Sequence, residues 1–238
     1  MPLTFSTTAA QAQSAGVKVC VHGRSGAGKT VLCSTCPRPI ILSPERGTLS
    51  IAKHNIPVIL IASISDLAEA YAWATTSKER ANFDTFCIDS ISEIAERILA
   101  DEKRKAKDPR QAYGELSDQL QAFVRLWRDI PGMNVYMTSK SELREQPDHT
   151  VLYSASLPGK ANGQGLAFYF DEFFYLGIGE YDDTRPGASL GAKLQYRYLQ
   201  TQLDSRIDAK DRSGVLAPIE EPHLGKIFDK IRAGLAVK

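Results

Sequence analysis

A glycine-rich octapeptide near the N-terminus carries the residues with the clearest chemistry. It reads Gly23-Arg24-Ser25-Gly26-Ala27-Gly28-Lys29-Thr30 and fits the pattern G-x-x-x-x-G-K-[ST] at every fixed position. Glycines let such a loop turn tightly, so that its backbone N–H groups point at phosphate oxygens. Lys29 would reach the β- and γ-phosphates of a nucleoside triphosphate, and the Thr30 hydroxyl would bind Mg²⁺. All eight residues are therefore expected to contact the nucleotide.

A carboxylate after an apolar strand completes the expected magnesium site. The run Thr85-Phe86-Cys87-Ile88 predicts a buried strand, and Asp89 follows it directly. In a phosphate-loop protein, such a carboxylate holds the water shell of Mg²⁺. An aspartate here can instead cap the next helix, but its pairing with the phosphate loop favours the metal. ATP and Mg²⁺ are thus the expected cofactors.

Two glutamates are candidates for the group that activates the attacking water. Glu45 follows the apolar run 39–43, and strand ends converge on the nucleotide in a doubly wound sheet. Glu93 lies four residues past Asp89, one turn into the next predicted helix. Either residue could be an exposed surface glutamate. Glu45 is favoured because a strand end points at the ligand.

Polar residues end the fifth apolar strand at Thr138-Ser139-Lys140. Their hydroxyl or ammonium groups could sense the γ-phosphate, and Ser139 is expected among the nucleotide contacts. Polar residues also occur wherever strands stop, so this pattern leaves both interpretations open.

The segment 141–165 has few apolar residues and predicts a long loop, with a glycine-rich part at 158–165. Loops of this length in a compact domain are usually functional or disordered. Glycines beside a cation suit the phosphate backbone of a polymer. The candidate nucleic-acid contacts are Lys140, Arg144, Lys160, Asn162 and Gln164.

Lys210 and Arg212 lie two residues apart near a turn. In ATPases that assemble into rings or filaments, such cations can reach the γ-phosphate of the adjacent subunit. A Lys-Asp-Arg turn is otherwise a solvated surface. Only the other motifs favour the catalytic interpretation.

Alternating strands and helices must position these residues. Apolar runs predict strands at 17–21, 39–43, 58–62, 85–88 and 135–137, with helical patterns between them. This alternation is typical of an α/β fold with a doubly wound, mostly parallel sheet. After residue 150 the runs 168–178 and 193–202 predict antiparallel strands added to the sheet, and 222–235 a closing helix. Residues 1–16 are expected to form an arm, and 17–238 a single domain.

Composition narrows the class of protein. Hydrophobic residues make up 43% and charged residues 24% of the 238-residue chain, as in soluble globular proteins. The net charge of +1 gives no global basic field, so any nucleic-acid contact must come from a local patch. The chain lacks a membrane-length apolar run and a signal pattern, which predicts a cytoplasmic protein with no membrane partner. Reduced thiols are then expected, and packing is favoured over a metal or redox role for Cys33 and Cys36.

In this order, the motifs resemble the RecA-type recombinase core, and most closely the small phage-encoded recombination proteins that carry only that core. The resemblance covers roughly residues 17–215 and rests on GRSGAGKT, LSPERG, TFCIDS, VYMTSK and PGKANGQGLAFYFDEFFYL. It implies a RecA-like P-loop ATPase that binds single-stranded DNA and acts in single-strand annealing. Glu45 would activate water, 141–165 would hold two DNA-contacting loops, and Lys210 and Arg212 would act across a subunit interface.

The same resemblance implies partners. These are single-stranded DNA, further copies of the chain in a ring or filament, and a single-strand binding protein; a phage-encoded protein would act in the host cytoplasm. The sequence departs from RecA at the end of the fifth strand, where a glutamine that couples nucleotide state to DNA binding is replaced by Thr138-Ser139-Lys140. That departure leaves the coupling mechanism open.

Two other functions are compatible with a phosphate loop. A small-molecule kinase would need an arginine-rich lid over its acceptor, for which the mixed-charge run DEKRKAKDPR at 101–110 is the candidate. A nucleotide-switched scaffold would bind ATP with little turnover. ATPase activity with and without single-stranded DNA distinguishes these functions.

Overall fold

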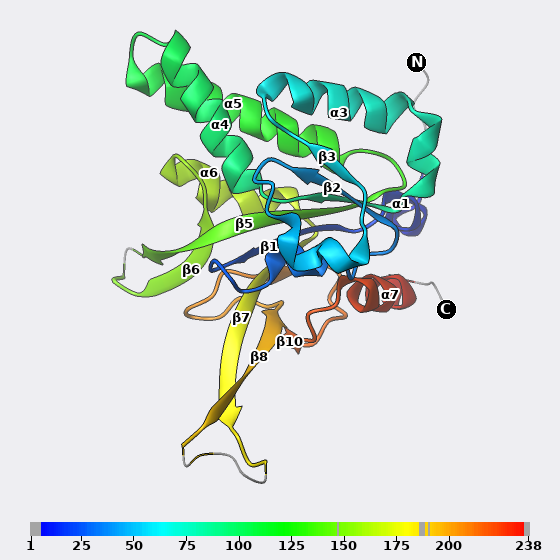
Figure 1. Ribbon diagram of the computed structural model, residues 1–238, viewed down its shortest axis with the longest axis vertical. Coiled ribbons are helices and arrows are strands. Elements are labelled where there is room, and N and C mark those ends of the chain that lie inside the picture. Colours follow the sequence, from blue (N-terminus) through cyan, green and yellow to red (C-terminus); the bar gives the residue numbers. More distant parts are fainter. Residues whose placement is uncertain (1–5, 147, 186–188, 190, 236–238) are drawn as a thin grey trace.

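A computed structural model describes residues 6–146, 148–185, 189 and 191–235. Residues 1–5 of the predicted arm lie outside this range. Within the described part, one sheet of ten strands runs through the molecule in the order β10-β8-β7-β1-β5-β4-β2-β3, with β6 on β5 and β9 on β7 (Figure 1). The strands are β1 (Lys18–Gly23), β2 (Pro39–Ser43), β3 (Val58–Leu60), β4 (Thr85–Ile88), β5 (Asn134–Glu145), β6 (Val151–Ser156), β7 (Glu172–Asp182), β8 (Lys193–Gln200), β9 (Lys210–Asp211) and β10 (Ile219–Glu220).

Helices cover both faces of the sheet. α3, α4 and α5 pack on one face, and α2 and α7 pack on the other (Figure 1). The helices are α1 (Thr8–Ala15), α2 (Lys29–Cys33), α3 (Ile64–Thr76), α4 (Ile91–Lys105), α5 (Pro109–Arg128), α6 (Lys160–Gly165) and α7 (Leu224–Leu235), with 3₁₀ turns η1 (Thr48–His54), η2 (Lys78–Asn82) and η3 (Leu166–Tyr169).

Strand β1 shows why this sequence forms a buried parallel strand. All six of its residues are buried, and it pairs in parallel with β5 on one side and with β7 on the other. Its side chains alternate between the two faces, so Cys20 joins the core under α3–α5 while Val19 and Val21 join the core under α2 and α7. The predicted α/β fold with a mostly parallel sheet and added antiparallel strands is confirmed. One strand differs, since β7, in the run 168–178 predicted to be antiparallel, pairs in parallel with β1 and antiparallel with β8 and β9.

The sequence interpretation was wrong about 141–165. β5 continues as one strand to Glu145 and turns back through β6, which pairs with it antiparallel from Lys140↔Ser156 to Glu145↔Val151. The glycine-rich part forms the short helix α6, with Gly163 so close to β6 that a Cβ there would lie 2.7 Å from the Ala155 carbonyl oxygen. Few apolar residues mark a solvated hairpin as well as a loop, since only one face of its strands needs burial.

Two helices begin or end at well-defined residues. α3 begins after Ser63, which caps it in a capping box with Asp66. α2 has only five residues and ends at Cys33. Cys33 and Cys36 are buried in the core beneath it.

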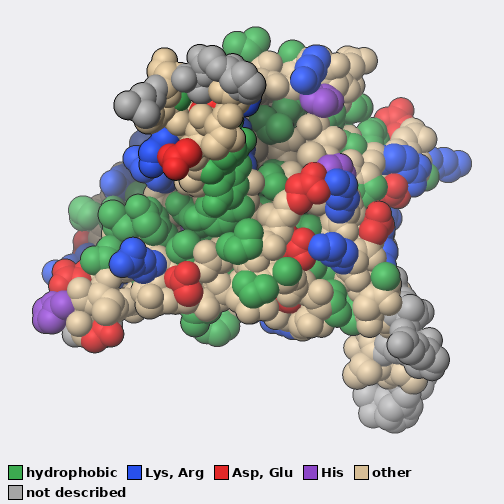
Figure 2. Space-filling view, turned by 90° about the horizontal axis from the view of Figure 1, so that it is seen from below, with side chains coloured by type: hydrophobic (Ala, Val, Ile, Leu, Met, Phe, Trp, Pro, Cys, Tyr) green, Lys and Arg blue, Asp and Glu red, His purple; other side chains and the backbone are tan. Residues whose placement is uncertain are grey.

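The β7–β8 hairpin projects far beyond the body of the molecule (Figure 1). On one face, the Tyr198 and Tyr196 rings lie over Gly177 and Gly179, where a Cβ would be 2.3 and 2.4 Å from ring carbon atoms. Cross-strand aromatic rings over glycines cover backbone that would otherwise be exposed. Figure 2 shows the molecule from the end toward which this hairpin projects. Hydrophobic side chains gather on the left half of that view.

None of the helices in the described residues combines the length and the apolar character needed to cross a membrane.

Candidate functional site: a phosphate loop at the carboxyl ends of the strands

Most of the predicted nucleotide and magnesium contacts gather where the parallel strands end. The loop 23–30 joins β1 to α2, and Asp89 follows β4. β5 lies between these two strands, with Gly23↔Lys140 and Ile88↔Met137 in register. The carboxyl ends of neighbouring strands are where open α/β sheets bind ligands.

Glycine is required at three points of the loop. Gly26 and Gly28 have φ angles of +78° and +111°, which favour residues without a Cβ. At Gly23 the limit is space, because a Cβ there would lie 2.9 Å from the Leu176 carbonyl oxygen. The loop conformation therefore follows from the same glycines that define the sequence motif.

Lys29 folds back over the loop. Its Nζ donates hydrogen bonds to the carbonyl oxygens of Gly23, at 2.7 Å, and Arg24, at 3.0 Å. Burial lowers the pKa of the Lys29 ammonium, and the nearby charges of Asp89 and Glu45 oppose that shift. The ammonium is thus held at the loop with two carboxylates close by.

Asp89 links the loop to β5. The Thr30 hydroxyl donates to Oδ2 of Asp89 at 2.6 Å, and the Thr138 hydroxyl donates to Oδ1. Thr30 and Asp89 thus bring a hydroxyl oxygen and a carboxylate together beside the loop, and hard oxygen donors of this kind suit Mg²⁺. These two residues fit the predicted metal site.

Glu45 lies beside Asp89 at the adjacent strand end. Its Oε1 accepts a hydrogen bond from the Ser90 hydroxyl, which also caps α4 by accepting from the Glu93 N–H at 3.2 Å. The rival, Glu93, forms an ion pair with Arg97 at 3.2 Å. Glu45 is therefore oriented by a hydroxyl, whereas Glu93 is held by a cation on its own helix.

Strand alternation separates Thr138 from Ser139. Thr138 faces Asp89, but the Ser139 hydroxyl is fully buried against Ser92, at 3.2 Å, and the Lys140 carbonyl oxygen. This placement favours Thr138, and not Ser139, as the strand-end contact. Beyond Ser139, the Lys140 Nζ pairs with Glu96 of α4 at 2.6 Å.

Three side chains beside the loop were missed by the sequence interpretation. Tyr136 donates its hydroxyl to the Lys29 carbonyl oxygen at 2.8 Å, and its alternation with Thr138 on β5 could have signalled it. His22 is buried, its pKa is lowered to about 4 by burial, and it contacts the Ser141 hydroxyl at 3.1 Å. Arg197 of β8 donates to the Ala27 carbonyl oxygen at 2.7 Å. No local pattern marks Arg197.

The candidate DNA contacts lie along the β5–β6 hairpin and α6. Lys140 and Arg144 are on β5, while Lys160 and Gln164 are exposed on α6. Asn162 is engaged within the protein, since it accepts from the Ser117 hydroxyl and donates to the Pro158 carbonyl oxygen, both at 2.9 Å.

Lys210 and Arg212 lie far from the loop of their own chain. β9 pairs with the start of β7, with Phe173↔Lys210, so both residues are at the amino end of the sheet. Lys210 Nζ donates at 2.5 Å to the carbonyl oxygens of Ala167 and Phe170, and Arg212 pairs with Asp171 at 2.9 Å. These contacts assign both cations a structural role within this chain.

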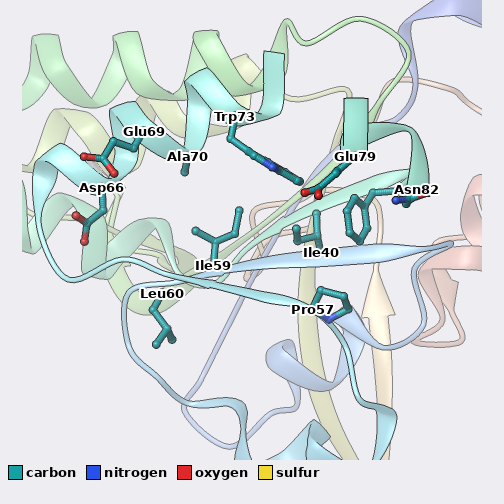
Figure 3. Close-up of a pocket in the computed structure, with 11 residues that line it drawn as sticks. Ile40, Pro57, Ile59, Leu60, Asp66, Glu69, Ala70, Trp73, Glu79 and Asn82 are labelled. Carbon is teal, nitrogen blue, oxygen red and sulfur yellow. The ribbon is translucent and has the colours of Figure 1, made fainter. Parts of the chain in front are cut away.

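A cavity of about 770 Å³ lies apart from this site, between α3 and the edge strand β3. Figure 3 shows Trp73 and Glu79 on one side of it and Ile40, Ile59 and Pro57 on the other. None of the predicted nucleotide contacts lines it, so it does not belong to the phosphate site.

Comparison with known proteins agrees with this geometry. No curated protein matches the chain. A family model described as an AAA domain matches residues 15–213, which span the loop, Glu45, Asp89 and all of β1 to β9. The chain therefore belongs to this AAA domain family of P-loop nucleoside triphosphatases and carries an ATPase core.

Proposed function

We propose that this protein is a RecA-like ATPase that binds single-stranded DNA, acts in strand annealing and recombination, and hydrolyses ATP within an oligomer. The observation that carries the proposal is the continuity of β5. One strand bears Thr138, hydrogen-bonded to Asp89 at the phosphate site, and runs on through Lys140 to Arg144 in the β5–β6 hairpin. A change in structure at the γ-phosphate could thus be transmitted along the backbone of β5 to a candidate DNA-binding surface.

The residues at the strand ends support hydrolysis. The loop N–H groups and Lys29 would hold the phosphates, and Thr30 and Asp89 would hold Mg²⁺, which supplies charge neutralisation at the phosphate oxygens. Glu45, oriented by the Ser90 hydroxyl, would accept a proton from the water that attacks the γ-phosphorus. The P–O bond to ADP breaks as the new P–O bond forms.

The hairpin and α6 support DNA binding. α6 packs against β6 through Gly163, so Lys160 and the β5–β6 strands form one connected surface. Cations on such a surface can contact the phosphates of a nucleic-acid strand, and aromatic rings can stack on its bases. The half-buried Tyr153 of β6 is the candidate ring, and its centroid lies 5.5 Å from that of the buried Tyr175 of β7.

The kinase alternative receives less support. Its candidate lid, 101–110, consists of the end of α4, a short connection and the start of α5, at the corner of the molecule farthest from α7 and well away from β1 (Figure 1). Its charges are used locally, since Arg104 and Lys105 pair with Asp101 at 2.8 and 2.6 Å. A lid would have to close over the loop.

The test is ATP turnover by the wild type and by Glu45→Gln, each with and without single-stranded DNA. DNA-stimulated hydrolysis that Glu45→Gln abolishes supports the proposal. Hydrolysis unaffected by DNA, with phosphoryl transfer to a metabolite, would indicate the kinase. ATP binding without turnover in the wild type would indicate the scaffold. Imaging with ATP and DNA tests for rings or filaments.

A further inference from the structure

The base of the β7–β8 hairpin supports both ends of the phosphate loop. A Cβ at Gly23 would lie 2.9 Å from the Leu176 carbonyl oxygen on β7, and a Cβ at Gly28 would lie 3.2 Å from Nε of Arg197 on β8. Arg197 is opposite Ile178 in the hairpin register, two residues beyond Leu176↔Leu199. Its side chain therefore lies on the same face as the buried Leu176–Leu199 pair, which packs in the core under the loop.

Arg197 holds one particular peptide unit of the loop. Its Nε donates a hydrogen bond to the Ala27 carbonyl oxygen at 2.7 Å. That carbonyl and the Gly28 N–H belong to the same peptide plane, and in a trans peptide the two point in opposite directions. Fixing the carbonyl toward β8 therefore fixes the Gly28 N–H away from β8. The N–H groups of such a loop are the groups that bind phosphate oxygens.

The interaction is well suited to hold a flexible peptide. Gly28 has a φ of +111°, a conformation open to glycine and to few other residues, so its own chain constrains it weakly. Within the described residues Arg197 forms no ion pair, so its charge is directed to this carbonyl and to solvent. Hydrogen bonds from a charged donor are stronger than neutral ones.

We propose that Arg197 is a positioning residue that aims the Gly28 N–H at the nucleotide phosphates and couples the β7–β8 hairpin to nucleotide binding. Because coupling free energies are reciprocal, a nucleotide that favours this loop conformation also orders the hairpin base. A partner whose binding moves the hairpin then changes the affinity for nucleotide, and nucleotide changes the affinity for that partner by the same factor. The inference rests on nucleotide binding alone and does not require DNA.

The first test measures binding of a fluorescent ATP analogue with Mg²⁺ to Arg197→Ala, Arg197→Lys and Lys193→Ala. Lys193 is the matched control, since it is a cation on the same face of β8, about 13 Å toward the tip. Arg197→Ala should weaken binding about tenfold, as expected for loss of one charged hydrogen bond. Arg197→Lys should recover part of the affinity, and Lys193→Ala should bind as the wild type does.

The second test separates positioning from simple stability. Thermal unfolding without nucleotide should be nearly the same for Arg197→Ala and Lys193→Ala, while the ATP-induced rise in Tm should shrink only in Arg197→Ala. Hydrogen exchange of β8 should slow on ATP addition in the wild type and not in Arg197→Ala. Unchanged ATP affinity in Arg197→Ala would overturn the proposal. So would a fall in Tm without nucleotide that accounts for the whole loss of binding.

Discussion

The two ends of the parallel strands hold the same kinds of charged residue in opposite settings. At the carboxyl ends, Lys29 and Asp89 are half-buried and bonded to loop carbonyls and hydroxyl groups. At the amino ends, Lys18 and Glu172 are only 6% and 1% exposed. The first set remains within reach of a ligand, whereas the second is enclosed by protein.

The amino-end charges show what enclosure does. Burial lowers the pKa of Lys18 to about 8, and its Nζ donates to the Met133 carbonyl oxygen at 2.5 Å. Burial raises the pKa of Glu172 to about 8, and the charge of the adjacent Asp211 adds to that shift. Perturbed pKa values therefore occur at both ends, and only the reachable set can act on a ligand.

The largest effect is expected from Lys29→Ala at the carboxyl end. Losing the ammonium that holds the β- and γ-phosphates should lower ATP turnover by more than about 100-fold. The free energy of unfolding without nucleotide should change little, because among the described residues the ammonium donates hydrogen bonds to two loop carbonyls and to no other group. Steady-state ATPase assays and denaturant unfolding measure the two quantities. Wild-type turnover in this variant would place the site elsewhere.

Glu45→Gln should separate chemistry from binding at the same end. The amide keeps a hydrogen-bond acceptor for the Ser90 hydroxyl but cannot take a proton from water, so kcat should fall about 100-fold. Affinity for ATP should stay within about twofold, as measured with a fluorescent analogue. Glu93→Gln is the control and should retain activity. The reverse result would make Glu93 the base.

Glu172→Gln should change pH dependence at the amino end. Glu172 is protonated below about 8 in the folded state but ionises near 4.5 when unfolded, so the unfolded state binds fewer protons between these values. Glu172 should therefore contribute a fall in stability of about 1.4 kcal/mol for each pH unit between about 4.5 and 8 in the wild type, and Glu172→Gln should lack this contribution. Lys18 does not interfere, because it stays protonated below about 8 in both states.

Urea unfolding at several pH values measures this slope. Equal slopes in the two proteins would mean that the pKa of Glu172 in the folded state is close to its ordinary value of 4.5. Enclosure at the amino end would then not perturb the ionisation of Glu172.

Lys210→Met should affect stability and leave turnover unaffected. Removing the ammonium leaves the Ala167 and Phe170 carbonyl oxygens without their donor, at a cost of about 1–2 kcal/mol. ATPase activity per folded molecule should be retained, also with DNA present. Loss of turnover at wild-type stability would instead restore the action across a subunit interface that the RecA resemblance implies.

The smallest effects are expected on the DNA surface. Arg144→Ala and Lys160→Ala should each weaken binding of a single-stranded oligonucleotide several-fold and reduce the salt slope by roughly 0.7. Lys226→Ala, on α7 and paired with Glu221 at 2.7 Å, is the control. Fluorescence anisotropy at several salt concentrations measures both quantities. Unchanged slopes would remove these residues from the DNA path.

Local patterns predicted a large part of the site. The phosphate loop is predictable because strand, glycine turn and helix start are contiguous in the chain. The positions of Asp89 and Glu45 at the same edge are predictable because the strands of a parallel sheet end there. The 141–165 segment forms a hairpin where a loop is predicted, because a polar composition fits a solvated hairpin as well as a loop.

The sequence by itself determined the ligand of the loop and the alternation of strands and helices, because both depend on residues close together in the chain. Only the tertiary structure decided which strand-end residue meets Asp89, which face Ser139 takes, and where Lys210 and Arg212 lie. It alone brought Arg197 to a loop carbonyl 170 positions away. Such contacts depend on strand order and register, which pairing across the whole sheet sets.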